Sequence, residues 1–513
     1  MSDQPGASPT SPMGEGALAA RTVIGAAWLL TWRMASRSLG LVSTLILARV
    51  LVPADFGIVA MATTFATIID ALSHIGVQDA LVRRIDDGHN LYDTAFTLQV
   101  GRGVITSAIV AAAAPAANWW FNEPRLVPML LVLAGASLLS GFENIGIVEF
   151  RRLMRYDLLF RLLIVPRIVS VAVAIPMALL LQSYWALLIA TVVAKLARTV
   201  MTYMVHSYRP RLRLSGWREL AGFSFWVWAA SLARLAWDRV DPFVLGPLLG
   251  PTEVGLYLLA LELASLPITE IVEPVADALF AGFSQAQKGG RSSVHHAPLV
   301  AATLVMFIMP LMITISCASG YVVAALLGPR WASADTPIAI LAWLCLFSPL
   351  SWVCSAVLIA NGFVRRDFVG KVIASLVRLA VLTVAVSMTE RLDFIAAAIM
   401  VCVAVESCAY LLLLKGLGKV RLGSVTGALA RTSLAGALVV LLLHQAGLAW
   451  QEVSMPSLSA FFHVALIGVL VTALYVAFVL VLWFLAGRPA GPETRLFDLT
   501  GGYVRPLVLR FSR

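Results

Sequence analysis

The sequence predicts an all-α, polytopic membrane protein with about fourteen transmembrane helices. Three observations lead to this fold class: 60% of the 513 residues are hydrophobic, only 13% are charged, and the mean hydropathy is +0.88. Because soluble domains contain roughly 25% charged residues, a water-soluble fold of this length could not hide so much apolar surface. Part of the surface must therefore face lipid.

Fourteen apolar runs are long enough to cross a hydrocarbon core of about 30 Å, which takes roughly 20 helical residues. Residues 1–17 and 488–513 flank these runs and are predicted to be a disordered tail and a basic tail. The predicted helices span residues 21–50, 56–82, 92–117, 126–148, 158–181, 184–206, 219–246, 253–284, 298–320, 335–360, 367–388, 393–415, 424–445 and 459–486.

The basic residues between these runs are distributed unequally over the two sides of the membrane. The side shared with the termini receives 22 Lys and Arg residues, whereas the other side receives only Arg49, Arg125, Arg330 and Arg391. Since Lys and Arg are enriched in cytoplasmic loops, both termini are predicted to be cytoplasmic.

Several function classes are excluded by composition and by missing motifs. The net charge of +10 does not indicate nucleic-acid binding, because the basic residues stand in short clusters between apolar runs. The segment "KGLGKV" at 415–420 lacks the first glycine and the Ser/Thr of a phosphate loop, and no H-E-x-x-H or G-x-S-x-G occurs. We therefore expect no enzymatic activity, metal or cofactor. Without a C-x-x-C pair, the cysteines are predicted to be small core residues: Cys317, Cys345, Cys354, Cys402 and Cys408.

A short motif occurs twice, which indicates an internal repeat. "RVLVPADFGIVAMA" at 49–62 matches "GPLLGPTEVGLYLLA" at 246–260 with an offset of 198, so that Pro53 pairs with Pro251 and Gly57 with Gly255. The offset covers six predicted helices, and an even number predicts two lobes related by a parallel pseudo-two-fold axis, a transporter architecture. The turn itself is predicted to be a structural hinge between helices. The predicted units are an N-lobe at 18–215, a C-lobe at 216–420 and two extra helices within 421–487.

Charged residues deep in the predicted helices suggest a central cavity. Arg33 and Arg37 are four residues apart, lie on one face of the first helix, and have no acid within one turn. The offset of 198 maps this polar face onto a second one in the seventh helix. Because an intramembrane Arg needs a partner or a wet cavity, and two guanidinium groups suit a phosphate or pyrophosphate, we expect an anion site here. The predicted substrate-binding residues are Arg33, Arg37, Arg234, Asp238, Arg239, Arg167 and Arg378.

Acidic residues in the same regions have two open interpretations. They could couple transport to protons or sodium, or they could neutralise the deep arginines. For any one deep arginine, an ion pair between helices is as good an interpretation as a place in the cavity wall. The candidates for ion coupling are Asp70, Glu262, Glu270 and Glu273.

Three segments resemble the polysaccharide transporter (Wzx-type flippase) family of the multidrug/oligosaccharidyl-lipid/polysaccharide exporter superfamily. They are "LARVLVPADFGIVAMA" followed by "GVQDALVRR", the second copy "LGPTEVGLYLLA", and "LLGPRWASADTPIAILAW" at 326–343, and the resemblance covers roughly residues 20–450. It implies a bacterial inner-membrane protein that moves polyprenyl-pyrophosphate-linked oligosaccharides to the periplasmic leaflet by alternating access. The polymer served would be an exopolysaccharide, a capsule or O-antigen. By role, Arg33, Arg37 and Arg234 would contact the lipid pyrophosphate.

Two other functions compete with this one. A cation-coupled exporter of drugs or small molecules from the same superfamily should have an acidic cavity. A polysaccharide polymerase or ligase should have a large external loop, and the sequence predicts none. The expected partners are the lipid-linked oligosaccharide, the bilayer, and a polysaccharide polymerase with its export machinery.

Overall fold

The structure is entirely helical over the part of the chain that it describes. The computed structural model describes residues 15–73, 78, 81, 89–153, 155–215, 225–288, 297–415, 422–451, 453, 455–489 and 492–494. No strand occurs within these ranges, which confirms the predicted fold class.

The long helices follow the predicted apolar runs closely. Short helices join them: η1 (Ile145–Ile147), α6 (Val148–Arg152), the π-helix η2 (Ile268–Val272), α13 (Ser319–Leu326), η4 (Pro329–Ala334) and α14 (Asp335–Leu341). The long ones are α1 (Glu15–Val50), α2 (Pro53–Leu72), α4 (His89–Phe121), α5 (Leu126–Gly141), α7 (Tyr156–Leu181), α8 (Trp185–Val205), α10 (Phe225–Ala264), α11 (Glu273–Lys288), α12 (Ala297–Cys317), α15 (Leu344–Ala360), α16 (Val364–Met388), α17 (Leu392–Lys415), α18 (Leu422–Gln445) and α19 (Ser457–Leu485).

Ten helices of the described chain are long and apolar enough to cross a membrane, or up to twelve if two bent helix pairs each form one span. The predicted total of fourteen stays a prediction. The helices α1 and α11 are not among the ten, and both carry charged residues that face the cavity described below. One predicted boundary is seen as a break: the runs 219–246 and 253–284 meet inside α10, where Gly250 leaves helical geometry with φ 79° and ψ 176°.

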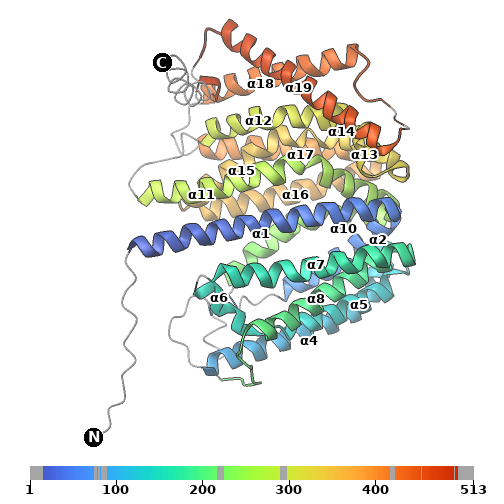
Figure 1. Ribbon diagram of the computed structural model, residues 1–513, viewed down its shortest axis with the longest axis vertical. Helices are drawn as coiled ribbons and strands as arrows, with labels where there is room; N and C mark the ends of the chain where they lie inside the picture. Colours follow the sequence, from blue (N-terminus) through green and yellow to red (C-terminus); the bar gives the residue numbers. More distant parts are fainter. Residues whose placement is uncertain are drawn as a thin grey trace, which may run out of the picture.

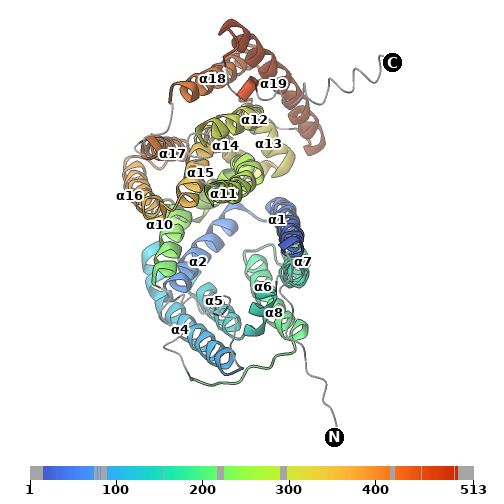
Figure 2. The same cartoon turned by 90° about the vertical axis from the view of Figure 1, so that its left-hand side faces the viewer.

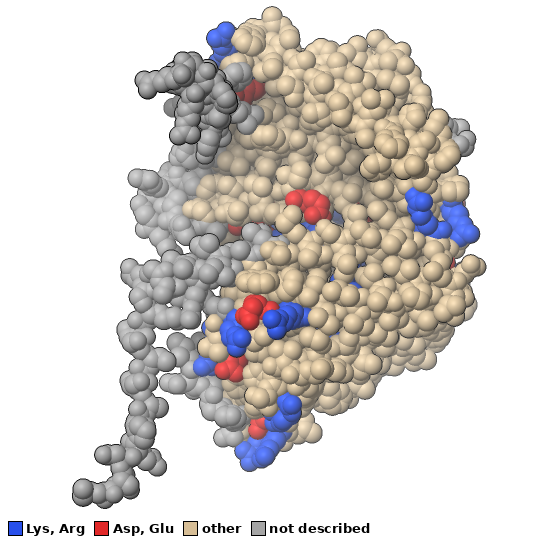
Figure 3. Space-filling model, viewed as in Figure 1, with Lys and Arg blue, Asp and Glu red and all other residues tan. Residues whose placement is uncertain are grey.

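The helices are arranged in two groups. Seen nearly end-on, α1 to α8 form an N-terminal group and α10 to α17 form a C-terminal group, while α18 and α19 lie at the far end (Figure 2). The last two helices pack on α12 and α13. In side view most long helices run roughly parallel to one another (Figure 1), and the face seen there carries only a few small groups of charged side chains (Figure 3). The residue boundaries predicted for two lobes and two extra helices stay a prediction.

The two copies of the sequence motif contact each other. A Cβ on Gly57 would overlap the carbonyl of Pro251 and the backbone of Gly255, and a Cβ on Gly255 would overlap the carbonyl of Pro53 and the backbone of Gly57. Only glycine permits so close an approach. The contact joins the start of α2 to the part of α10 that begins after Gly250, so the N-terminal and C-terminal groups meet here backbone to backbone.

Asp55 explains why α2 begins where it does. Its carboxylate accepts a hydrogen bond from the Val52 amide (3.3 Å) and one from the Tyr184 amide (3.0 Å). The first bond satisfies an amide just before the helix, where a negative charge is favourable. The second ties the start of α2 to the connection between α7 and α8.

The Val50 end of α1 is sealed against the C-terminal group. Trp331 of η4 is fully buried and its indole donates to the Ala48 carbonyl (2.6 Å), while Arg330 donates to the Val50 carbonyl (2.7 Å). Phe56 packs edge-on against Trp331, with ring centroids 5.3 Å apart. Helix α1 therefore belongs to the N-terminal group but ends on the C-terminal one.

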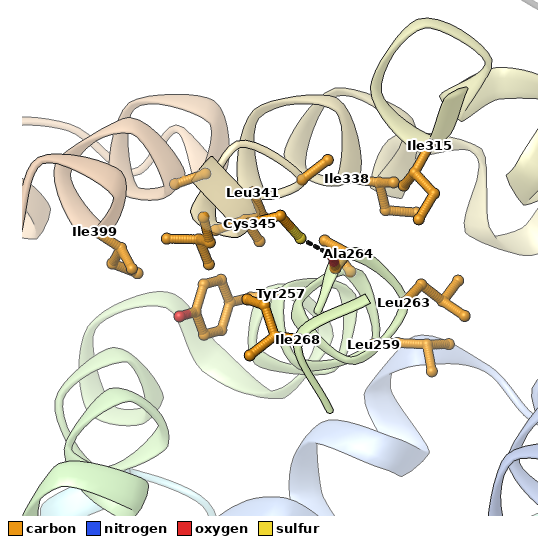
Figure 4. Close-up of a cluster of buried hydrophobic side chains, with 14 of the residues drawn as sticks. Tyr257, Leu259, Leu263, Ala264, Ile268, Ile315, Ile338, Leu341, Cys345 and Ile399 are labelled. Carbon is orange, nitrogen blue, oxygen red and sulfur yellow. Dashed lines mark hydrogen bonds between the residues drawn. The ribbon is translucent and has the colours of Figure 1, made fainter. Parts of the chain in front are cut away.

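The core of the C-terminal group forms where the second half of α10 packs on α12, α14, α15 and α17 (Figure 4). Cys345 lies in this cluster, and its thiol donates to the Ala264 carbonyl (3.5 Å). Four of the five cysteines are buried as predicted. The prediction was wrong for Cys408, which is exposed, because α17 turns this position away from the helices it packs on.

Candidate cavity between α1 and α11

A cavity of about 510 Å³ lies between the two helix groups, between α1 on one side and the end of α10, η2 and α11 on the other. It is lined by one face of α1 that includes Trp32, Ser36 and Gly40. Its charged lining residues are divided by helix group. The N-terminal group supplies cations and the C-terminal group supplies anions, namely Arg33, Arg37 and Arg167 against Glu262, Glu270 and Glu273.

Arg33 forms ion pairs across the boundary between the groups. Its guanidinium contacts Glu273 (Nη2 to Oε2, 2.7 Å) and also Asp277 of α11. The Arg33 side chain remains 33% exposed. These pairs are therefore partly hydrated and can be exchanged for another anion without a large desolvation penalty.

Arg37, one turn along α1, makes three contacts with the same wall. It lies 3.2 Å from Glu270 and 3.4 Å from Glu273, and it donates to the Thr269 carbonyl (2.6 Å). Thr269 lies in the π-helix η2. A wide π-turn rearranges the usual i→i−4 bonds and is frequent at functional sites, and here one of its carbonyls points at an arginine.

Arg167 reaches the cavity from α7. Its guanidinium lies directly against Gly40, where a Cβ would overlap it. Glu262 lies close enough to Arg167 and Arg37 to interact electrostatically with both. Gly40 thus has a specific use, because its missing side chain lets a cation from α7 lie on the surface of α1.

The structure does not bring all of the predicted site residues to this cavity. Arg378 is buried elsewhere, with Nε 2.8 Å from Oδ1 of Asp241, and Tyr257 donates to the same carboxylate (2.6 Å). This ion pair joins α10 to α16 inside the C-terminal group, so Arg378 does not line the α1–α11 cavity, and its predicted contact with substrate stays a prediction. Its partner Asp241 stands on a distant helix, which spacing along the chain does not show.

The remaining predicted residues are placed as follows. Asp70 pairs with Arg102 (3.3 Å) inside the N-terminal group, outside the cavity. Arg239 is half-buried and is not part of the cavity lining. The side chains of Arg234 and Asp238 lie outside the described part of the structure.

Sequence reasoning missed one lining residue and left open which acids pair with which arginines. Trp32 lines the cavity, and its buried indole N–H has no hydrogen-bond partner among the described residues. The acids Glu270, Glu273 and Asp277 pair with Arg33 and Arg37. Their spacing of three and four residues places them on one helical face, and this signal could have matched them to the two arginines.

Comparisons with known proteins give the family and the fold. Residues 46–336 match the polysaccharide biosynthesis protein family. The chain is 22% identical over 321 residues to the lipopolysaccharide biosynthesis protein WzxC of Escherichia coli (strain K12), and 26% identical over 326 residues to the succinoglycan biosynthesis transport protein ExoT of Rhizobium meliloti (strain 1021). Each match covers 61% of this chain and 64% of the relative, so the chain spans less than two thirds of the curated relatives that it matches.

Solved structures show a transporter fold. The lipid II flippase MurJ in an inward closed conformation aligns with a TM-score of 0.69 and 13% identity, over 90% of this chain and 99% of that one. An inward-facing multidrug resistance MATE family transporter aligns with a TM-score of 0.58 and 15% identity, over 75% and 96%. The multi-pass membrane protein described here therefore belongs to the polysaccharide biosynthesis protein family.

Proposed function

We propose that this protein is a flippase for lipid-linked oligosaccharides. It would move polyprenyl-pyrophosphate-linked repeat units from the cytoplasmic to the periplasmic leaflet of a bacterial inner membrane, for the synthesis of a surface polysaccharide, by alternating access. The observation that carries the proposal is the α1–α11 cavity, in which three arginines of one helix group face three glutamates of the other.

The opposite charges of the two walls suggest how an anionic head group is bound. When the groups separate at this end, Arg33 and Arg37 lose Glu270 and Glu273 and need another anion. A diphosphate can accept bidentate hydrogen bonds from both guanidinium groups. The substrate would thus replace the carboxylates, and its binding would stabilise the open state over the closed one.

The size and the closure of the cavity agree with one state of such a cycle. The Val50 end of α1 is sealed by Trp331, whereas the cavity lies around Arg33 and Arg37, nearer the terminus predicted to be cytoplasmic. Asp277, which pairs with Arg33, is 60% exposed. About 510 Å³ falls within the range of about 300–1,000 Å³ for sites of small ligands. It suits a diphosphate with its first sugars, so a complete repeat unit would require further opening.

The test is complementation of a strain that lacks this protein. Arg33→Ala combined with Arg37→Ala should abolish surface polysaccharide while the amount of inserted protein stays normal. A matched control is Arg365→Ala combined with Arg366→Ala, because these two arginines are exposed at the start of α16, away from the cavity. Normal polysaccharide in the Arg33/Arg37 variant would overturn the proposed site.

A second candidate is a cation-coupled exporter of small molecules. It is favoured by Glu262, Glu270 and Glu273, which could attract a cation once the arginines move away. It predicts that loss of the protein sensitises cells to cationic drugs and leaves polysaccharide normal. The flippase proposal predicts the opposite phenotype: loss of the protein reduces polysaccharide and leaves drug sensitivity unchanged. A polysaccharide polymerase and its export machinery would then act on the flipped repeat unit.

A further inference from the structure

A second pocket lies at the same end of the molecule as Val50 of α1 (Figure 1). Its volume is about 720 Å³. It is lined by the end of α12 and the start of α13, by α14, by the first turns of α15 and α17, and by Trp450 between α18 and α19. The helices α13 and α14 lie at the Val50 end of α1 (Figure 1). We call it the Trp450 pocket, after one of its lining residues. It shares no lining residue with the α1–α11 cavity.

The floor of the Trp450 pocket is aromatic and apolar. Trp343 and Phe347 project from consecutive turns of the α14–α15 bend, and Met400 of α17 faces them. The Trp343 indole donates to the Ser316 hydroxyl (3.1 Å), which donates in turn to the Ala339 carbonyl (2.8 Å). These bonds hold the indole in one orientation, so its face is a preformed surface.

The rim of the pocket is polar and carries one charge. Asp335 Oδ1 accepts hydrogen bonds from the amide (2.5 Å) and the hydroxyl (3.1 Å) of Thr336. Its second oxygen accepts no hydrogen bond from the described residues and is available to a ligand hydroxyl. Ser319 adds a hydroxyl to the lining.

Trp450 completes the rim in a strained conformation. Its φ is 54°, in the left-handed region that bulky residues rarely adopt, and its amide donates to the Cys317 carbonyl (2.9 Å). The side chain is 46% exposed although it is a tryptophan. Backbone strain of this kind concentrates at ligand sites, and here it holds an aromatic ring over the pocket mouth.

We propose that the Trp450 pocket binds a neutral sugar of the transported glycan. Aromatic faces stack against the C–H face of a pyranose, and a carboxylate with neighbouring hydroxyls bonds to its hydroxyl groups. The one charged lining residue is Asp335, which repels a phosphate, so an anionic lipid head group does not fit as well. The assignment of the glycan rests on the proposed function, since it places the pocket on the side where the sugars emerge.

The test measures binding of free oligosaccharides to the purified full-length protein in nanodiscs. The probes are the fragments released by mild acid from the surface polysaccharide of the same strain, titrated by calorimetry. Trp450→Ala and Asp335→Asn should each weaken binding by roughly tenfold. Trp119→Ala is the matched control, because Trp119 is also highly exposed but lies outside the pocket, and it should leave binding unchanged.

Each outcome separates this proposal from the proposed function. Equal binding by Trp450→Ala, Asp335→Asn and the unchanged protein would overturn the sugar site. A pocket that binds no fragment and instead holds a phospholipid would also overturn it. The Arg33→Ala/Arg37→Ala variant should bind the free fragments normally while failing to complement in cells. If that variant complements fully and Trp450→Ala still loses sugar binding, the flippase site falls and the sugar site stands.

Discussion

The arginines of the α1–α11 cavity differ from Arg378 in what surrounds them. Arg33 and Arg37 stand at the boundary between the helix groups, remain about one third exposed, and share three carboxylates. Arg378 lies inside one group, is 7% exposed, and pairs with Asp241, whose carboxylate also accepts a hydrogen bond from the Tyr257 hydroxyl. The comparison indicates that the first set can exchange its partners, whereas the second is a permanent connection between α10 and α16.

The largest effect is expected at the permanent pair. Arg378→Met leaves Asp241 buried without its counter-charge, and removing one member of a buried pair costs about 3–5 kcal/mol. The variant should therefore unfold at a clearly lower temperature, measured by fluorescence-detected thermal unfolding. Replacing both members, as in Arg378→Met with Asp241→Leu, should recover most of this loss. A single variant as stable as the unchanged protein would show that the pair is not a structural connection.

The contact of Gly57 with Gly255 also lies at the boundary between the two helix groups, but it is made by backbone atoms and not by charged side chains. Gly57→Ala or Gly255→Ala should cost about 1–3 kcal/mol, because the added methyl group meets backbone atoms. Since both changes disturb one contact, the double variant should lose less than the sum of the two. Thermal unfolding checks this, with Gly135→Ala as the control, because a Cβ there meets nothing within 4 Å. Full additivity would contradict a shared contact.

A smaller effect on stability, but a larger one on conformation, is expected for Glu273→Gln. Arg33 and Arg37 both lose a partner, yet the pairs are partly exposed, so stability should change by less than about 1 kcal/mol. The separation between α1 and α11 should instead increase. Spin labels at Ser38 and Ala278, both exposed, would report it in a Cys408→Ser background. An unchanged distance distribution would mean that these ion pairs do not hold the groups together.

The smallest effect is expected at the Arg125–Glu123 pair in the connection between α4 and α5, in which the arginine is exposed. The hydrogen bonds from the Arg125 side chain hold the pKa of the Glu123 carboxyl below its usual value. Stability from this pair is therefore present above the usual pKa of Glu and is lost as the pH falls through the lowered one. Arg125→Gln should change stability by at most about 0.5 kcal/mol at neutral pH, and thermal unfolding between pH 7 and pH 3 should show a flatter acid limb.

The sequence predicted most of the fold because hydrophobic runs and turn residues are local signals. Pro53 and Asp55 are residues typical of a helix start, and α2 begins at Pro53. The offset of the repeat pairs Gly57 with Gly255, and these two residues are in contact. The site was predicted only in part. Arg33, Arg37, Glu262, Glu270 and Glu273 do line one cavity, but which charges pair depends on helices that lie more than 200 residues apart in the chain.

Trp32 and Arg378 show why the rest could not be predicted. Trp32 resembles any apolar residue of a membrane helix, and only tertiary packing places it in the cavity lining with its indole N–H buried and unpartnered among the described residues. Arg378 looked like the other deep arginines, since nothing near it in the sequence identifies Asp241 as its partner. Periodicity gives the face of a helix, whereas the neighbour of that face is set by tertiary packing.

The reciprocal contact of Gly57 and Gly255 has a consequence for how the two halves of the chain can diverge. Each glycine leaves room for the first residues of the helix that carries the other one. A larger residue at either position fills the same space, so the two positions cannot drift independently, although 198 residues separate them. Among homologous chains we therefore expect these two sites to vary together or not at all, and an alignment of relatives can establish this without any experiment on the protein.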